Sequence, residues 1–415
     1  MLPALSPIAS YRRLLQLSGP SYVVVAFLGR IPLAMSQMGI LLLVSDKTGR
    51  YGYGGLAAGA FAIANAIGAP VAGAIADRIG QRPVVLVQSA VSGLGLVALV
   101  TTTTAQAPLP AIVGLAVLAG LACPQVGPLA RVRWRPITRP AGHEQPRLVD
   151  AAFSYEGAAD EASFVLGPTL VGLVGVLISP AGAIVVAAVM LVVFGGWFGL
   201  HPTAELTKSA RGAPVVGPAR LLSVNFAALL VAQLLIGTLF GATQTGTTVL
   251  ATAAGQSSLA GLVHAVLGVG SVVAGLGTAA LPPSFTHERR LLVASTALFV
   301  LSLPLLWVGG LGGLIAVILV LGFAVAPYVI TTFTIAERVV PPSAVAAAMT
   351  LLAAATGIGY ALGSGVAGRL ADWGGHTPAF AVTVSAMGAA AVLAFAARTR
   401  LRHALQTAQT GRPLG

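Results

Sequence analysis

Long apolar runs, separated by short charged or Pro/Gly-rich breaks, dominate the chain. A bilayer core about 30 Å thick requires about 20 predominantly apolar residues per helix, and twelve runs meet that length. The pattern predicts an all-α integral membrane protein with 12 transmembrane helices. The expected spans are residues 21–44, 54–76, 83–104, 109–130, 155–178, 180–200, 224–250, 257–281, 291–309, 311–335, 343–368 and 377–397.

The basic residues predict the orientation of these spans. With a cytoplasmic N-terminus, nineteen of the 23 Lys and Arg residues fall in the inside segments. Only Lys47, Arg50 and Arg369 fall outside, and Arg30 lies within a span. Because cytoplasmic loops carry the excess of Lys and Arg, we expect both N- and C-termini to be cytoplasmic, beside a lipid bilayer with an anionic inner leaflet.

The spans divide into two six-helix halves. We expect an N-terminal half over residues 1–200, a cytoplasmic interdomain linker over 201–223, a C-terminal half over 224–397 and a basic cytoplasmic tail over 398–415. The other long inside segment is 131–154, whereas the outside connections are short. Two six-span halves lying wholly in the membrane are the layout of a secondary transporter built from repeats.

Composition excludes several other classes. The chain is 56% apolar and only 8% charged, whereas about a quarter of residues in soluble domains are charged. Its net charge of +12 does not indicate a nucleic-acid partner, because the basic residues punctuate apolar runs instead of forming a hydrated face. One cysteine, Cys123, excludes an intrachain disulfide and a multi-cysteine metal site, and we expect no metal and no cofactor. The first apolar run lacks a small-residue cleavage site, so we expect no cleaved signal peptide.

The loop between spans two and three carries a distinctive motif. It runs Gly73-Ala-Ile-Ala-Asp77-Arg78-Ile-Gly80-Gln81-Arg82. A glycine at position 73 allows close approach of a neighbouring helix, Gly80 permits a tight reversal, and Asp77 is suited to hold an arginine or cap a helix end. The alternative is a short positive loop without a conformational role.

This loop resembles the signature loop of the major facilitator superfamily, and the resemblance extends over the whole chain through the six-plus-six layout. Gly73, Asp77, Arg78, Gly80 and Arg82 match the pattern, whereas Ile75 replaces a leucine and Gln81 replaces a basic residue. The resemblance implies the major facilitator fold. It also implies that the loop is a conformational latch between the halves in the outward-open state of alternating access.

Spans four and five bear on the direction of transport. In span five, Gly167, Pro168 and Gly172 resemble part of the motif associated with antiporter branches, although Ser163 and Val171 replace glycines. This resemblance favours export, and the alternative is ordinary helix kinking and small-residue packing. Span four lacks the membrane-embedded arginine that many drug/proton antiporters of the superfamily carry there. The sequence therefore does not support proton coupling through that arginine. Weaker echoes of the loop motif occur at residues 286–290 and 368–372.

Arg30 is the one basic residue expected near the bilayer midplane. An intramembrane arginine costs at least about 2.5 kcal/mol on insertion scales, so it requires a partner or a water-filled cavity. Pro32 predicts a distorted helix beside it. Arg30 either faces a cavity, where it attracts an anionic substrate or senses a carboxylate, or it belongs to a structural ion pair. The expected partners and coupling candidates lie on span five: Glu156, Asp160 and Glu161.

Other polar residues within spans are further candidates. His264 either titrates as a coupling group or forms a neutral hydrogen bond between helices. Span seven carries a polar cluster that either lines a cavity or joins helices. In the superfamily layout, spans one, four, seven and ten surround the substrate cavity. The substrate-cavity candidates are Arg30, Gln37, Gln233, Thr243, Gln244 and Tyr328.

The combined expectation is a secondary active transporter of the plasma membrane that moves a small organic molecule by alternating access. We expect proton-coupled efflux by a monomeric, multi-pass protein of the bacterial inner membrane. The alternative is an uptake permease or uniporter for a sugar or organic anion. No ATP-binding loop is present, so we expect the gradient that drives transport to come from elsewhere. A membrane-embedded transferase is disfavoured because His264 has no catalytic partner nearby in the sequence. We therefore expect no enzyme activity.

Overall fold

The computed structural model describes residues 7–49, 51–207, 223–256, 259–282 and 284–410, and all regular structure in these ranges is helical. The described part contains eleven helical stretches that are long and apolar enough to cross a membrane. One of them, Leu109–Leu177, has 69 residues, or about 100 Å at 1.5 Å per residue. A 3₁₀ turn, η1 (Arg139–Glu144), interrupts it where Gly142 has a φ of 56°.

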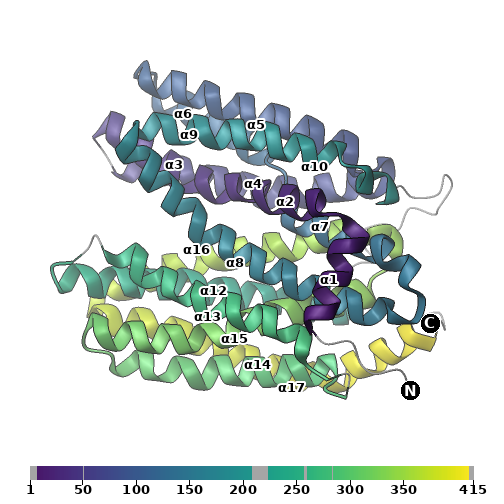
Figure 1. The fold of residues 1–415 in the computed structure, drawn as a ribbon. Coiled ribbons are helices and arrows are strands. Elements are labelled where there is room, and N and C mark those ends of the chain that lie inside the picture. The colour runs from purple at the N-terminus through teal and green to yellow at the C-terminus, as the bar shows by residue number, and fades with distance from the viewer. Residues whose placement is uncertain (1–6, 50, 208–222, 257–258, 283, 411–415) are drawn as a thin grey trace.

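The N-terminal group of helices begins with the short α1 and continues to residue 207. Figure 1 shows most of this group packed as one layer of the molecule. Its elements are α1 (Pro7–Ser18), α2 (Pro20–Leu28), α3 (Ile31–Thr48), α4 (Tyr51–Ile79), α5 (Gln81–Thr104), α6 (Leu109–Leu121), α7 (Val126–Thr138), α8 (Gln145–Leu177), α9 (Pro180–Met190), the π-helical η2 (Leu191–Gly195), α10 (Gly196–Leu200) and η3 (Pro202–Thr207).

The C-terminal group forms the second layer in Figure 1. Its elements are α12 (Val224–Ala253), α13 (Ala260–Gly277), η5 (Thr278–Ala280), α14 (His287–Ser302), η6 (Leu303–Trp307), α15 (Leu311–Val339), η7 (Pro342–Ala344), α16 (Val345–Gly374) and α17 (His376–Thr410). Two seams join the groups, because α8 packs on α13 and α15 while α16 packs on α4.

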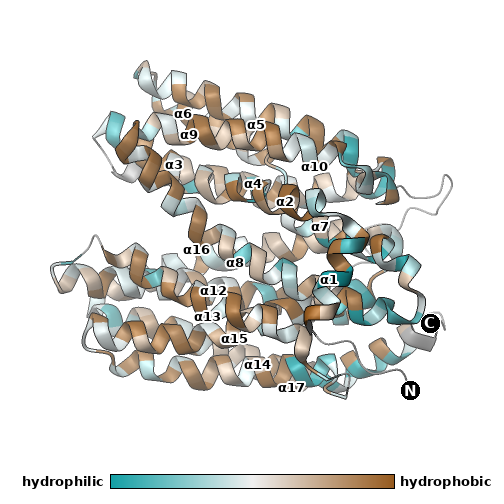
Figure 2. Ribbon diagram, in the orientation of Figure 1, coloured by the Kyte–Doolittle hydropathy of each residue, from teal (hydrophilic) through white to brown (hydrophobic). Residues whose placement is uncertain are grey.

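Apolar side chains cover most of the outside of both groups. Figure 2 shows brown, hydrophobic ribbon along the helices and teal segments concentrated at the end where both termini lie. Many large apolar side chains are exposed, including Val176 at 86% and Val392 at 70%. A surface of this kind is stable against lipid chains and would be unfavourable in water.

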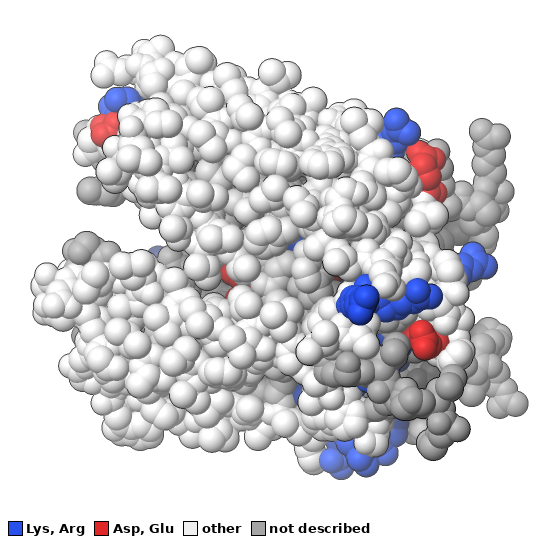
Figure 3. All heavy atoms as spheres, viewed as in Figure 1, with Lys and Arg blue, Asp and Glu red and all other residues white. Residues whose placement is uncertain are grey.

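Charges gather at one end of the molecule. In Figure 3 most Lys and Arg atoms lie at the end that carries the termini, and the long sides are almost free of charge. At the opposite end the molecule is hollowed between the two groups, and acidic atoms are visible within the hollow.

Three helix boundaries differ from the sequence prediction. The helix expected at 155–178 begins ten residues earlier, at Gln145, and the helix expected at 109–130 breaks after Leu121 and continues as α7 to Thr138. The expected cytoplasmic segment 131–154 is therefore mostly helix, because α7 and α8 extend the spans into it. Helix α17 also continues to Thr410, and Leu401 and Leu405 within the expected tail are buried. Most of the expected linker, residues 208–222, lies outside the described residues.

Candidate functional site

A buried cluster of charged residues lies inside the N-terminal group. Arg30 stands at the break between α2 and α3. Its Nη2 is 2.6 Å from Glu156 Oε2, and its Nη1 is 2.9 Å from Asp160 Oδ1. The remaining donors are also used, since Nε donates to the Ala26 carbonyl at 3.0 Å and Nη1 to the Glu156 carbonyl at 3.2 Å. Of the three expected partners, the structure therefore joins Glu156 and Asp160 to Arg30.

Helix α7 completes this cluster. Arg131 Nη1 is 2.8 Å from Asp160 Oδ2, and the Trp134 indole donates to Glu156 Oε1 at 2.6 Å. Two arginines thus face two carboxylates, and the four charges balance. Arg30, Arg131 and Glu156 are almost fully buried, whereas the Asp160 side chain is 26% exposed. Asp160 is therefore the member of the cluster that solvent reaches.

Two sequence expectations about this region are wrong. Span four does carry a buried arginine, Arg131, and neither Arg131 nor Arg133 is a surface anchor, because both side chains are buried. The physical reason is the helix break at residues 122–125. The chain continues beyond it as α7, so the two arginines remain inside the helix bundle, where Asp160 and neutral oxygens compensate their charges.

Asn65 on α4 holds the break between α6 and α7. Its Nδ2 donates to the Gly120 and Cys123 carbonyls at 3.1 and 2.9 Å. Gln125 Nε2 in turn donates to Asn65 Oδ1 at 2.5 Å. These bonds satisfy backbone groups that a broken helix leaves free within a membrane. Cys123 itself is buried and has a free thiol.

Glu161 lies next to the cluster but outside its ion pairs. Within the described part of the chain, no ion pair joins Glu161 to a basic side chain. It faces the seam between α8 and α13, where Ser271 is its neighbour. His264 lies on α13 as well, and its Nδ1 is buried without a hydrogen-bond partner. Both coupling candidates are therefore on the seam between the two groups.

The other expected cavity residues do not converge on Arg30. Thr243 is fully buried and shares a 3.0 Å hydrogen bond with Thr383 of α17. Gln233 accepts a 2.9 Å bond from Thr356 of α16. Gln244 accepts a 2.7 Å bond from Tyr360. These contacts join helices of the C-terminal group, so they match the helix-joining alternative for span seven.

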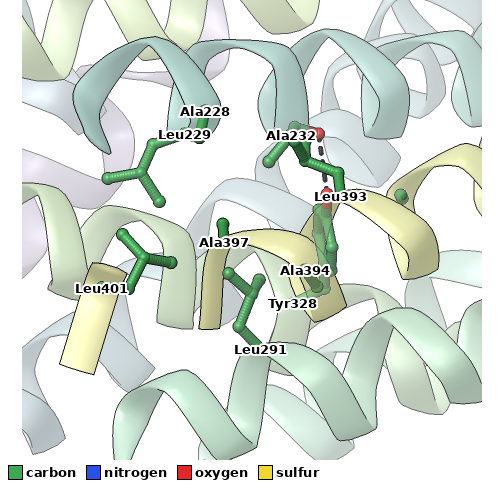
Figure 4. A pocket seen from close by; sticks show the side chains of 10 residues that line it. Ala228, Leu229, Ala232, Leu291, Tyr328, Leu393, Ala394, Ala397 and Leu401 are labelled. Atoms are coloured by element: carbon green, nitrogen blue, oxygen red, sulfur yellow. Dashed lines mark hydrogen bonds between the residues drawn. The ribbon is translucent and has the colours of Figure 1, made fainter. Parts of the chain in front are cut away.

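Tyr328 also lies away from the hollow. Its hydroxyl donates to the Ala232 carbonyl at 3.0 Å, and its ring lines an apolar cavity of about 10 Å³ between α12, α14 and α17 (Figure 4). That volume holds about one water molecule, which is too little for an organic substrate. Gln37 on α3 is half-buried and, like Arg30, belongs to the N-terminal group.

The motif between α4 and α5 connects the two groups at the end with the termini. The Asp77 carboxylate accepts hydrogen bonds from the backbone N–H groups of Ala346 and Ala347, at 3.1 and 2.9 Å. These residues begin α16, so the carboxylate meets the positive end of a helix dipole. Gly73 lies in the same contact, because a Cβ there would be 2.4 Å from Thr350 Oγ1. Gly80 has a φ of 90°, which suits glycine at the turn into α5.

The remaining motif positions have separate partners. Arg78 is exposed, and Arg82 forms a 3.4 Å surface ion pair with Glu205. Gln81 is buried: its Nε2 donates to the Leu129 carbonyl and its Oε1 accepts from Arg133 Nε at 2.8 Å. Arg133 needs a neutral or acidic acceptor at this point. A basic residue at position 81 would instead place two like charges together, which explains the departure from the family pattern.

Three further contacts close this end of the molecule. Arg135 pairs with Glu337 at 3.0 Å, and Arg338 pairs with Asp150. Arg131 Cζ lies 4.3 Å from the centre of the Phe333 ring on α15, a distance suited to a cation–π contact. Arg131 therefore links Asp160 in the N-terminal group to Phe333 in the C-terminal group.

The glycines of span five have different surroundings. A Cβ at Gly167 would be 2.6 Å from Ala34 Cβ, so this position lets α8 approach α3 closely. Nothing lies within 4 Å of a Cβ at Gly172, and Pro168 is exposed. Of the three residues, only Gly167 contributes to a close helix contact.

The echo of the loop motif at residues 286–290 makes most of its contacts within the C-terminal group and one contact with the N-terminal group. Glu288 pairs with Arg402 at 3.2 Å, and Arg290 donates to three carbonyls, those of Leu281, Pro282 and Phe285. His287 instead reaches Asp150 of α8 at 3.5 Å.

Sequence reasoning missed Arg131, Asn65, Arg133 and Phe333 as members of these networks. A signal existed for the first two, because Cys123-Pro124 predicts a helix break, and a break near the midplane requires polar compensation. Nothing in the sequence indicates that Phe333 faces Arg131, since the two residues are 202 positions apart.

Two comparisons with known proteins, one with family models and one with solved structures, identify the family and the fold of this chain. The family model of the Major Facilitator Superfamily matches residues 22–321 and 286–414. Most of the chain is matched, and the protein therefore belongs to the major facilitator superfamily. It is a multi-pass membrane protein with the fold of these transporters. No curated protein sequence matches the chain.

Solved structures share the fold at low sequence identity. A bacterial homologue of the iron transporter ferroportin in an outward-facing state has a TM-score of 0.72 and 14% identity, over 91% of this chain and 100% of that one. The human organic anion transporter MFSD10 (TETRAN) has a TM-score of 0.67 and 19% identity, over 90% of this chain and 99% of that one. The E. coli fucose:proton symporter FucP has a TM-score of 0.63 and 15% identity, over 90% of this chain and 98% of that one. Such identities establish the fold alone. The family and these neighbours are transporters and not enzymes.

Proposed function

We propose that this protein is a proton-coupled secondary transporter that exports a small organic molecule across the plasma membrane by alternating access. In this proposal the 69-residue stretch Leu109–Leu177 crosses the membrane twice, which makes twelve spans in two six-helix halves, 1–200 and 224–397, joined by the linker 201–223. The basic end of the molecule, where both termini lie (Figure 3), faces the cytoplasm. The hollow then faces outward.

The contacts at the basic end support a role as gate and latch. The halves meet there through Asp77 on the start of α16, Arg135 with Glu337 and Arg338 with Asp150. All of them must separate before the cytoplasmic side opens. The conformational latch of Gly73, Asp77, Arg78, Gly80 and Arg82 would thus stabilise the outward-open state, with Asp77 supplying the contact across the halves.

The observation that carries proton coupling is the position of Asp160. It is shared by Arg30 and Arg131, and its side chain is 26% exposed, so a proton from the hollow can reach it. Protonation of Asp160 removes the negative charge that holds Arg131. Because Arg131 stacks on Phe333 of the other half, this change weakens a contact that closes the cytoplasmic side. Glu161, beside Asp160 and on the α8–α13 seam, is the second proton acceptor.

The charge balance of the cluster bears on the substrate. Arg30 directs its donors to Glu156, Asp160 and backbone oxygens, and it is buried, so little of it remains to bind an anion. Asp160 is the partly exposed charge of the cluster, and Glu161 lies beside it in the sequence. A neutral or cationic organic compound therefore fits better than the organic anion considered among the sequence alternatives.

Flux in proteoliposomes tests this proposal. We expect an imposed pH gradient to drive transport of ethidium, used as a cationic organic probe, or of neutral compounds in a parallel panel. The Asp160→Asn variant should lose about tenfold or more of the gradient-driven rate and keep exchange of labelled for unlabelled probe, because exchange needs no net proton movement.

A matched variant controls for general damage. Asp372→Asn makes the same carboxylate-to-amide change at an exposed position of α16 and should keep the pH dependence. Transport that is equal with and without the gradient would contradict proton coupling and favour a uniporter. Gradient-driven accumulation on the opposite side would favour an uptake permease.

A further inference from the structure

The first helix, α1, lies at the membrane boundary on the basic end of the molecule. It precedes the first candidate span, which begins at Pro20, and only Gly19 separates the two. One face of α1 is buried through Ser10, Leu14 and Ser18. Because α2 begins the first candidate span, we expect α1 to lie at the level of the lipid headgroups.

The opposite face of α1 is exposed and has the composition of an interfacial helix. Ile8 and Leu15 are 80% and 44% exposed, and Arg12 and Arg13 are exposed beside them. In the described part of the chain, no ion pair joins either arginine to a carboxylate. Apolar and basic side chains together on one helix face complement the acyl boundary and anionic headgroups of a bilayer.

Helix α1 also bridges the two halves. It packs on α2, α7 and α8 of the N-terminal half, while the Tyr11 hydroxyl donates to the Leu276 carbonyl of α13 at 2.7 Å. Burial raises the pKa of Tyr11 to about 12, against a smaller opposing effect of Ser154. The phenol therefore keeps the proton that it donates at physiological pH. Figure 1 shows α1 lying across the end that carries the termini, beside α8.

We propose that Arg12 and Arg13 of α1 bind anionic phospholipid headgroups, and that this binding holds the two halves together at the basic end through Tyr11. The effect of lipid rests on the alternating access proposed above, because α13 and α8 must separate when this end opens. Anionic lipid then favours the state seen here, in which the basic end is closed.

Distance measurements on the full-length protein in nanodiscs test the proposal. Spin labels at Arg139→Cys and Arg289→Cys, two exposed positions on opposite halves of the basic end, report opening there. Cys123 is buried and stays unlabelled. We expect phosphatidylglycerol mixed with phosphatidylcholine to raise the ratio of short to long distances about threefold or more over phosphatidylcholine alone.

Three variants test whether the lipid dependence arises from Arg12, Arg13 and Tyr11. Arg12→Gln with Arg13→Gln should abolish the lipid dependence, whereas the matched pair Arg398→Gln with Arg400→Gln, exposed on α17, should keep it. Tyr11→Phe should also lose the gain in short distances, because α1 then no longer bonds to α13. Equal distributions in both lipids, or equal loss in both arginine pairs, would overturn the proposal. Proton-driven flux is measured in a single lipid composition, so its failure is a separate result.

Discussion

The contact between the first and fifth spans is ionic in the proposed N-terminal half and is made by glycines in the proposed C-terminal half. In the N-terminal half, α3 and the preceding break pack on α8 through Arg30, Glu156 and Asp160. In the C-terminal half, α12 packs on α16 through glycines and one neutral bond, between Gln233 and Thr356. These are the first and fifth spans of each half. One seam carries charge near the membrane centre and the other carries none.

In the C-terminal seam, glycines let the backbones of α12 and α16 contact each other directly. Gly237 and Gly241 on α12 approach the backbone of α16, and Gly359 and Gly363 on α16 approach the backbone of α12. Each pair has the spacing of a GxxxG motif. A Cβ at Gly359 would lie 1.9 Å from the Leu234 carbonyl oxygen. Such a seam leaves little room for side chains to rearrange at the glycine positions. In the proposed mechanism the ionic seam changes its charge on protonation, so the responsive part of the molecule would lie in the N-terminal half.

The largest expected effect comes from breaking the ionic seam. Glu156→Gln removes one of the two charges that compensate Arg30 and leaves a buried charge partly unpaired. We expect a loss of about 3 kcal/mol or more in the free energy of unfolding. Thermal unfolding of the purified protein in detergent measures this. An unchanged midpoint would show that the cluster is not required for folding.

An intermediate effect is expected at the glycine seam. Gly359→Ala forces a methyl group against a carbonyl oxygen of α12, and overpacking of this kind costs about 1–3 kcal/mol. Gly357→Ala on the same helix is the matched control, because nothing lies within 4 Å of a Cβ there. The control should be neutral or slightly stabilising. Equal midpoints for both variants would contradict the close backbone contact.

The smallest effect is expected from the neutral bond between the same helices. Thr356→Val removes the donor to Gln233 and keeps the side-chain shape, so we expect a loss of under about 1 kcal/mol. Proton-driven flux should be unaffected in this variant and lost in Asp160→Asn, which changes the charge of the ionic seam. A Thr356→Val loss as large as that of Glu156→Gln would show that the two seams are equally dependent on polar contacts.

Local patterns predicted much of the fold and part of the candidate site. Apolar run lengths indicate the membrane helices, and Pro32 beside Arg30 indicates the distorted first span that the structure shows between α2 and α3. The cost of a charge in lipid was enough to expect acidic partners for Arg30 on the fifth span. The spacing could not indicate that α7 continues the broken fourth span, and for this reason Arg131 was misassigned to a surface loop.

Hydrophobic length and a short loop motif are local properties, so they were enough to indicate a membrane protein and its family. The same local pattern limited the charges within spans to a few residues. Which of these charges meet depends on how distant helices pack. Arg30 pairs with residues 126 and 130 positions away, and Asp77 caps a helix that begins 268 residues later. Ion pairing and helix capping act over about 3 Å, and the packing of distant helices brings these groups within that range.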